Sequence, residues 1–316
     1  MKLLIRLGII IFGLASIVSF SISLFLVREM YVQGIKQKGA SPRNHFALYL
    51  PDNRDAFFTE IIRGAERAAA ESGTIISVHS IDPARAELAM ASYTGVDGVV
   101  VCPYLDDGAA RRQLSKLTAK KIPLVLINHN VPNEQPWPYI GANNFDVGRR
   151  MGAAAKNLNR SGIRLAVVYS DKSPGIFAER ELVEMGITAS LKNRLAAPIT
   201  GLKTGLNPLD AEAMIYGLFR TASPINTLVF TDSIDTVAAA QALIDMNLVG
   251  RVQIIGFGNS KGILEYIRKG IIAGSVVVNP EKIGYEAIKS LKELRDTGYT
   301  STAVDAGVEL VDRSRL

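Results

Sequence analysis

The chain contains very little cysteine: a single residue, Cys102, among 316. One cysteine excludes an intramolecular disulfide bond and any metal site built from several thiolates. Cys102 follows three consecutive valines in an apolar run. We therefore expect its thiol to be buried and unreactive.

The sequence also lacks the motifs that mark common classes of enzyme. It has no phosphate-binding P-loop, no zinc-ligand spacing and no nucleophile elbow. Gly256, Gly258 and Gly262 resemble a dinucleotide-binding turn only superficially, because their spacing is not GxGxxG and no acidic residue follows at a suitable distance. His129 has no serine, cysteine or metal-spaced partner for catalysis. We expect a protein that is not an enzyme and needs no cofactor.

Most of the chain carries little net charge, and the positive excess lies near the amino terminus. The formal net charge is +6, but residues 1–43 hold six lysines and arginines against one glutamate, which gives +5. The remainder is therefore close to +1 (6 minus 5). A nucleic-acid-binding face would need its basic residues in the body of the protein, so this distribution argues against nucleic acid as a partner.

The first 44 residues predict a membrane segment and a tether. Residues 7–27 are apolar apart from small residues and serines, long enough to cross a bilayer and longer than the core of a usual signal peptide. No small-x-small cleavage pattern ends the run cleanly. We expect an uncleaved signal anchor over residues 1–30 and a linker over 31–44, with a cleaved signal peptide as the alternative. Basic residues flank both sides, so charge alone does not set the orientation.

The body begins with a stretch that predicts half of a βαβ unit. Residues 45–50 are apolar, 52–55 form a polar turn, and a helical pattern runs from about 56 to Gly73, a residue suited to a helix C-cap. The turn lies at the carboxyl end of the strand, where open α/β sheets bind ligands. Asp55, followed by the aromatic pair Phe57 and Phe58, makes this turn a candidate seat for a small polar molecule with one apolar face.

Strand-like and helical patterns then alternate along the chain, which predicts parallel sheets with right-handed crossovers. The expected strands cover residues 74–80, 99–102, 122–127, 139–141, 165–169, 199–202, 228–231, 252–257, 274–278 and 308–312. The expected helices cover residues 84–92, 107–120, 145–159, 177–192, 209–221, 236–246, 261–269 and 280–294. We predict an α/β fold of two similar lobes.

A family resemblance rests on eight segments in one order: LYLPDNRDAFFTEIIRGAERAA, GVDGVVVCP, IPLVLINHN, YIGANNFDVGRRMG, AERELVEMG, LVFTDSIDTVAAAQAL, VQIIGFGN and VNPEKIGYEA. Over residues 46–311 the chain resembles the type I periplasmic binding proteins, the sugar-binding group related to ribose-binding and LacI-type sensor domains. The resemblance implies two Rossmann-like lobes joined by a hinge, within a domain at 45–316. Lobe 1 would comprise about 45–130 and 280–305, and lobe 2 about 131–279 and 306–316.

The resemblance also implies a ligand site between the lobes. Asp55, Phe57 and Phe58 match the polar-x-aromatic-aromatic position of the first lobe, although either phenylalanine could instead begin the core stripe of its helix. Asn128 and His129 stand where sugar binders commonly have Asp-Arg. Asparagine and neutral histidine each donate and accept, so recognition of hydroxyl groups survives the change.

The second lobe matches the family pattern less well. Arg180 matches an arginine that donates to ligand oxygens, with a solvated helix arginine as the alternative. Ser233 aligns with the usual Asn or Asp, and Asp232 precedes it. Asn259 lies beside the usual Asp position, which Gly258 occupies. Elsewhere, Tyr104 and Trp137 could supply replacement stacking surfaces or serve structural roles.

Two functions follow from the resemblance. The first is a membrane-anchored, extracytoplasmic solute-binding protein, held in the cell membrane by a single span, that binds a sugar or polyol and signals closure to a sensor histidine kinase. The alternative is the substrate-binding subunit of a carbohydrate ABC importer, whose partner is a permease. A third reading is a structural module without a ligand. LacI-type repressors carry a helix-turn-helix where this chain carries its apolar segment, so a transcription factor is rejected.

Overall fold

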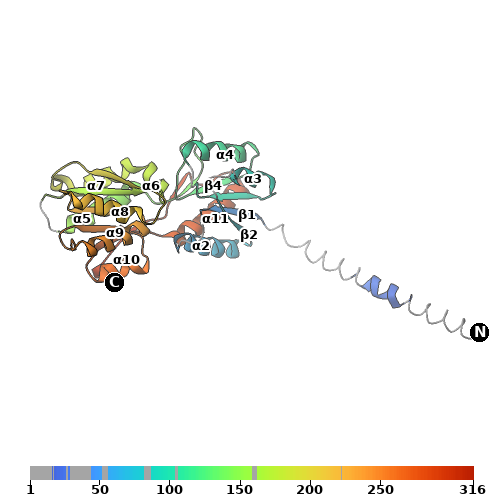
Figure 1. The fold of residues 1–316 in the computed structure, drawn as a ribbon. Coiled ribbons are helices and arrows are strands. Elements are labelled where there is room, and N and C mark those ends of the chain that lie inside the picture. Colours follow the sequence, from blue (N-terminus) through green and yellow to red (C-terminus); the bar gives the residue numbers. More distant parts are fainter. Residues whose placement is uncertain are drawn as a thin grey trace, which may run out of the picture. The chain divides into compact units, whose positions relative to one another are not determined.

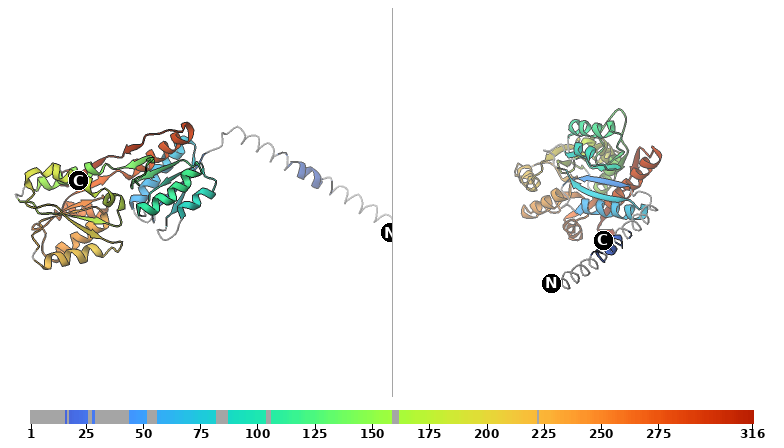
Figure 2. Two further views of the ribbon diagram at one scale, coloured as in Figure 1. Left: turned by 90° about the horizontal axis from the view of Figure 1, so that it is seen from above. Right: turned by 90° about the vertical axis from the view of Figure 1, so that its right-hand side faces the viewer.

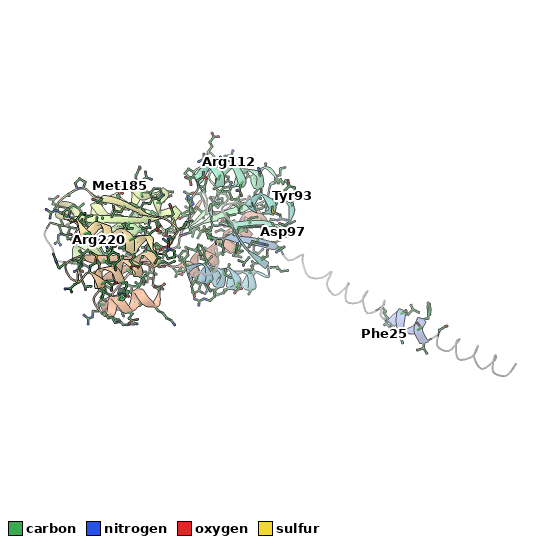
Figure 3. The ribbon with its side chains drawn as sticks, in the orientation of Figure 1. Phe25, Tyr93, Asp97, Arg112, Met185 and Arg220 are labelled. Atoms are coloured by element: carbon green, nitrogen blue, oxygen red, sulfur yellow. The ribbon has the colours of Figure 1, made fainter. Side chains whose placement is uncertain are left out.

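The computed structural model describes residues 16, 18–25, 28, 44–51, 56–81, 87–103, 106–158, 162–221 and 223–316. The chain forms two compact units, Met1–Asn44 and His45–Leu316. Most of the predicted anchor and linker lies outside the described residues. Within the described part of the chain, no helix is both long and apolar enough to span a membrane. The residues of the first unit that are described include a helical stretch over 18–25, with Phe25 labelled in Figure 3.

The first lobe of the larger unit is a six-stranded sheet in the order β11-β5-β4-β3-β1-β2. All neighbouring strands in it are parallel. Its strands are β1 His45–Leu50, β2 Ile75–Ser80, β3 Gly98–Val101, β4 Leu124–Ile127, β5 Tyr139–Gly141 and β11 Ala303–Asp305. Helices α2 Ala56–Ser72 and α11 Pro280–Thr297 cover one face, and α3 Glu87–Met90 and α4 Asp107–Ala119 cover the other (Figure 1).

The second lobe repeats this arrangement. Its sheet has the order β12-β10-β9-β8-β6-β7, so β6 to β10 follow the same spatial order as β1 to β5. Its strands are β6 Leu165–Ser170, β7 Thr200–Thr204, β8 Thr227–Phe230, β9 Gln253–Phe257, β10 Ile272–Val278 and β12 Val308–Asp312. The pattern of apolar runs predicted parallel strands, but β12 pairs with β10 in the antiparallel direction.

Helices also cover both faces of the second sheet, as Figure 2 shows. On one face lie α5 Asn144–Asn157, α6 Pro174–Ala178 and α7 Arg180–Leu191. On the other lie α8 Asp210–Arg220, α9 Ser233–Asp245 and α10 Lys261–Arg268. The single helix expected at 177–192 is in fact two helices. Glu179 separates them because its backbone (φ −108°, ψ 28°) leaves the helical region, while its carboxylate accepts a hydrogen bond from Asn144.

Apolar runs form the central strands because both of their faces are covered by helices. Val99, Val100 and Val101 are fully buried. Two helix pairs pack at backbone distance because glycines leave room for the neighbouring helix. A methyl group added at Gly64 of α2 would lie 1.9 Å from the carbonyl oxygen of Glu281 in α11, and one at Gly148 of α5 would lie 2.0 Å from that of Val183 in α7.

The chain crosses between the lobes three times: from β5 to α5, from β10 to α11, and from β11 to β12. Because β5 pairs with β4, the first lobe extends to Gly141, beyond the boundary at about residue 130 drawn from the sequence. The stretch between β4 and β5 returns the chain to the same sheet. The crossing itself follows Gly141.

Candidate functional site

The crossings place the carboxyl ends of the two sheets opposite each other. The chain leaves the carboxyl end of β5 to enter the second lobe, and leaves the carboxyl end of β10 to enter the first. Ala142 and Phe257, at the ends of β5 and β9, each pack against the cores of both lobes. Loops at the carboxyl ends of parallel strands are where open α/β sheets bind ligands. The residues that follow these strands are therefore the candidate site.

The turn after β1 is only partly described, and Asp55 lies outside the described residues. Phe58 is 8% exposed and belongs to the first-lobe core. Phe57 is half-buried, packs against that core, and meets Phe58 edge to face with 5.4 Å between ring centroids. The burial of Phe58 fits the core-stripe alternative, and Phe57 keeps an accessible edge near the strand end.

Asn128 directly follows β4 in a left-handed backbone conformation, with φ +61°, which asparagine tolerates better than most residues. Its backbone N–H donates to the carbonyl of Ile140 at 3.0 Å, and its side chain hydrogen-bonds the thiol of Cys102. Burial raises the pKa of that thiol to about 12, so the thiol stays protonated and inert, as the sequence predicted.

His129 is 2% exposed, and both of its ring nitrogens are occupied. Nδ1 lies 2.7 Å from the carbonyl oxygen of Pro103, and Nε2 lies 2.9 Å from Oδ1 of Asp107. The ring therefore ties the end of β4 to the start of α4. As folded, it has no free ring nitrogen to offer a ligand, in contrast to the contact that the resemblance implied.

Of the two proposed replacement stacking residues, Tyr104 lies outside the described residues. Trp137 is 7% exposed, and its Nε1 donates to Oγ1 of Thr118 at 2.9 Å. The indole is packed into the core between β3, β4 and α4. Of the two roles considered for Trp137, ligand stacking and a structural role, the structure supports the structural one.

In the second lobe a buried ion pair occupies the strand ends. Lys172, after β6, and Asp235, in the first turn of α9, lie 2.9 Å apart between Nζ and Oδ1. Nζ also donates to the carbonyl of Gly205 after β7 at 2.8 Å, and Oγ1 of Thr204 donates to Oδ2 of Asp235 at 2.6 Å. The pair joins three strand ends. The sequence analysis did not single out either residue, although each is a charge in the segment that follows an apolar strand.

Asp232 and Ser233 lie beside this pair. Oδ1 of Asp232 accepts from the backbone N–H groups of Ile234 at 2.9 Å and Asp235 at 3.0 Å, which caps α9. Burial raises the pKa of Asp232 from 3.8 to about 6, outweighing the opposing effect of those hydrogen bonds and of Lys172. The predicted ligand carboxylate therefore also has a local structural role.

Ser233 and Asn259 follow β8 and β9, in loops that lie close together. A methyl group added at Gly258 would lie 3.1 Å from Cβ of Ser233, so the two loops are in contact. Gly258 has φ +89°, a conformation that suits glycine, and its carbonyl accepts from Oγ of Ser275 at 2.5 Å. Asn259 is exposed and Ser233 half-buried. The structure thus brings three predicted positions together: Asp232, Ser233 and Asn259.

Arg180 is exposed at the start of α7. Its guanidinium carbon lies 5.1 Å from the ring centroid of Phe177, and Nζ of Lys203 lies 4.6 Å from the same centroid. Nζ of Lys203 is also 2.7 Å from Oδ1 of Asp171. Phe177 is half-buried and lies within 5.1 Å of both cationic groups, and it is an aromatic group that the sequence analysis did not single out. In the sequence, its position three residues before Arg180 could have indicated that the two side chains lie close together.

The chemistry of this arrangement is hydrogen bonding beside aromatic and aliphatic surface. Among the residues the structure describes, no three His, Cys, Asp or Glu side chains converge on a possible metal position. The exposed or half-buried polar groups near the strand ends include the Asn259 amide, the Ser233 hydroxyl and the charged groups of Arg180 and Lys203, all of which can form hydrogen bonds.

Comparison with solved structures identifies the fold. GanP, a glucose-galactose binding protein from Geobacillus stearothermophilus, matches with a TM-score of 0.77 and 20% identity over 87% of this chain and 99% of its own. An ABC transporter solute-binding protein from Agrobacterium vitis, bound with α-D-tagatopyranose, matches at 0.75 and 17% over 86% and 95%. A chain of a XylFII–LytSN complex matches at 0.73 and 22% over 87% and 100%.

Comparison by sequence identifies the family. No curated protein sequence matches this chain significantly. The family model described as a periplasmic binding protein domain matches residues 46–298, most of the chain. The protein therefore belongs to the periplasmic binding protein family, as the eight sequence segments indicated, and its body has the two-lobed fold of that family's type I members.

Proposed function

We propose that this protein binds a sugar between its two lobes and reports the resulting closure to a protein in the membrane. The observation that carries the proposal is the opposition of the two sets of strand ends, with Asn128 on one side and Asp232, Ser233 and Asn259 on the other. A ligand that contacts both sets favours the closed state by its differential affinity for that state.

The class of ligand is inferred from chemistry and from relatives. Hydroxyl, amide and carboxylate groups next to half-buried aromatic rings suit a sugar, whose hydroxyls need hydrogen bonds and whose C–H faces stack on rings. Similar structures are described as binding glucose and galactose, tagatose, arabinose or allose. Their identities to this chain are 17–20%, so they motivate the choice of sugars to test.

Thermal unfolding in the presence of each sugar tests the proposal. The protein is heated with D-glucose, D-galactose, D-tagatose, D-arabinose or D-allose, and with polyols and nucleosides as comparison ligands. A ligand that binds only the folded state raises the melting temperature in proportion to the logarithm of its concentration. We expect a rise with at least one sugar, confirmed by calorimetric titration. No rise with any sugar, alongside a rise with a nucleoside, would replace the proposed ligand class.

Membrane attachment is the second part of the proposal. In the described stretch over residues 18–25, five large apolar side chains are 55–69% exposed: Val18, Phe20, Ile22, Leu24 and Phe25. Such a stretch is unfavourable in water and favourable in lipid. We propose that residues 1–30 anchor the chain and that the body lies outside the cytoplasm. Cell fractionation combined with protease treatment of intact spheroplasts tests this, because an outward body is cleaved and an inward one is protected.

The partner distinguishes two candidate functions. One similar chain belongs to a XylFII–LytSN complex, so a protein of this fold can assemble with a second protein. Another is described as the sugar-binding protein of an ABC transporter from Bacillus halodurans, which supports a permease. A permanent anchor raises the effective concentration near one membrane partner and favours signalling. Neighbouring genes for a kinase and response regulator would support the first function, whereas genes for a permease and ATPase would support the second.

A further inference from the structure

The two lobes touch through backbone atoms at Gly175, the second residue of α6. A methyl group added at Gly175 would lie 2.3 Å from the carbonyl oxygen of Asn128 and 3.0 Å from Cα of His129. A carbon atom cannot lie 2.3 Å from a carbonyl oxygen that it is not bonded to, so one of the two segments would have to move. Gly175 belongs to the second lobe and is buried, whereas Asn128 and His129 end β4 of the first. The contact is therefore made across the junction of the lobes.

Neither side of this contact can yield easily. On the first lobe, the Asn128 N–H donates to Ile140, and the His129 ring is held between Pro103 and Asp107. On the second lobe, Pro174 fixes the backbone φ at the first position of α6. The next residue, Ile176, is 8% exposed in the second-lobe core. A side chain at position 175 would therefore move the lobes relative to each other rather than adjust locally.

A separate observation places the end of α6 near the first lobe. Burial raises the pKa of the Tyr139 hydroxyl in β5, and the charge of the Glu179 carboxylate adds to that rise. Glu179 stands between α6 and α7, immediately before Arg180. The end of α6 at Glu179 thus lies near the first lobe, with Phe177 two residues before Glu179 and Arg180 directly after it.

We propose that Gly175 is a positioning residue of the ligand site. By letting the first turn of α6 rest on the backbone of Asn128 and His129, it sets the spacing between the candidate ligand segments of the two lobes, the turn at Asn128 on one side and the stretch with Phe177 and Arg180 on the other. The role in binding rests on the proposed function, whereas the spacing of the lobes can be measured without any ligand.

The test compares Gly175→Ala with Gly217→Ala in the full-length protein. Gly217 lies on the exposed side of α8, where an added methyl group would meet nothing within 4 Å. Nitroxide labels are attached at Arg112→Cys in the first lobe and Arg220→Cys in the second, both exposed and labelled in Figure 3. Native Cys102 is 2% exposed and should escape labelling. The distance between the labels is then measured by pulsed electron spin resonance, without ligand.

We expect the label distance to change in Gly175→Ala and to match the parent in Gly217→Ala. For any sugar of the panel above that the parent binds, we expect an about tenfold or larger loss of affinity in Gly175→Ala alone, the usual size of a local overpacking effect. An unchanged label distance would overturn the proposal, as would a changed distance with unchanged affinity. Loss of the folded state in Gly175→Ala would also overturn it, because Gly175 would then serve folding rather than spacing.

The two proposals fail in distinguishable ways. If the parent protein binds no sugar, the proposed ligand class fails, but the label distance still decides whether Gly175 spaces the lobes. If the parent binds a sugar and the label distance does not respond to Gly175→Ala, the ligand class stands and the role of Gly175 is rejected.

Discussion

The ammonium nitrogen of Lys172 lies 2.9 Å from Oδ1 of Asp235, and the two side chains are 10% and 1% exposed. The two residues are 63 positions apart in the chain and follow different strands. Their contact joins the loop after β6 to the first turn of α9, and the Gly205 carbonyl adds the end of β7. A nearly buried ion pair thus holds together the loops at the carboxyl ends of the strands of the second lobe.

Removing one member of this pair should be costly. Asp235→Ala leaves the ammonium of Lys172 buried without its counter-charge, and we expect the free energy of unfolding to fall by about 3–5 kcal/mol. The double variant Lys172→Met with Asp235→Asn removes both charges at similar volume, and it should recover most of that loss. Urea unfolding of the parent, Lys172→Met, Asp235→Asn and the double variant measures the coupling, with Asp235→Ala unfolded alongside.

A surface pair serves as the control for that experiment. Nζ of Lys292 lies 2.6 Å from Oδ2 of Asp296, but these side chains are 34% and 48% exposed. Water and salt screen such a pair, so Lys292→Met should leave stability almost unchanged. Equal effects of Asp235→Ala and Lys292→Met would contradict the view that burial makes the first pair important.

Asp232 should make stability depend on pH in the acidic range. Its pKa is raised from 3.8 to about 6, so between these values the folded protein binds more protons than the unfolded one. The contribution of Asp232 to the free energy of unfolding therefore decreases as pH rises from about 4 to 7, by at most about 3 kcal/mol. Asp232→Asn keeps the helix-capping oxygen and cannot ionise. Urea unfolding should show that the variant is more stable than the parent at pH 7 and similar to it near pH 4. If the free energy of unfolding of the variant depends on pH as strongly as that of the parent, another group causes the pH dependence.

The glycines of the paired helices should tolerate no side chain. A methyl group at Gly64 would lie 1.9 Å from the Glu281 carbonyl oxygen, so Gly64→Ala must push α2 and α11 apart. We expect a loss of about 1–3 kcal/mol or more. Gly217→Ala should instead gain about 0.5–1 kcal/mol, because it adds helix propensity without a clash. Thermal unfolding compares the two, and opposite signs are the expected outcome.

His129 should contribute to stability more than to binding. His129→Phe keeps the ring volume but removes the hydrogen bonds to the Pro103 carbonyl and to Asp107. The buried carbonyl then lacks its donor, and we expect a loss of about 1–3 kcal/mol in the free energy of unfolding. Affinity for a sugar that the parent binds should change much less. A large loss of affinity at unchanged stability would restore the ligand contact that the sequence resemblance implied.

The strand and helix pattern could be read from the chain because it is set locally. The apolar runs at β1, β3, β6 and β8 are fully or almost fully buried. Gly73 ends α2 with φ +66°, as its position after the helical pattern predicted. The lobe boundary was placed too early because β5 is only three residues long. A strand that short has no periodicity of its own, and its membership of the first sheet depends on pairing with β4 and β11.

The site was predicted less completely, for a physical reason. Residue type and position after a strand pointed to the loops that hold Asn128, Asp232, Ser233 and Asn259, and the structure places these residues directly after β4, β8 and β9. The partners of each side chain depend on residues distant in sequence. His129 was read as a ligand group, but its ring is occupied by Pro103 and Asp107. Lys172 and Asp235 were not singled out from the sequence, because their contact forms only when the fold brings the two segments together.

By itself, the sequence determined the family, the alternation of strands and helices, and the positions of the loops that follow the strands, because apolar periodicity and turn residues act over a few neighbours along the chain. Only the tertiary structure decided which polar groups are already satisfied, where the first lobe ends, and how closely α6 approaches the end of β4. These depend on distances between segments that are far apart in sequence, and such distances are fixed only when the sheets and helices pack.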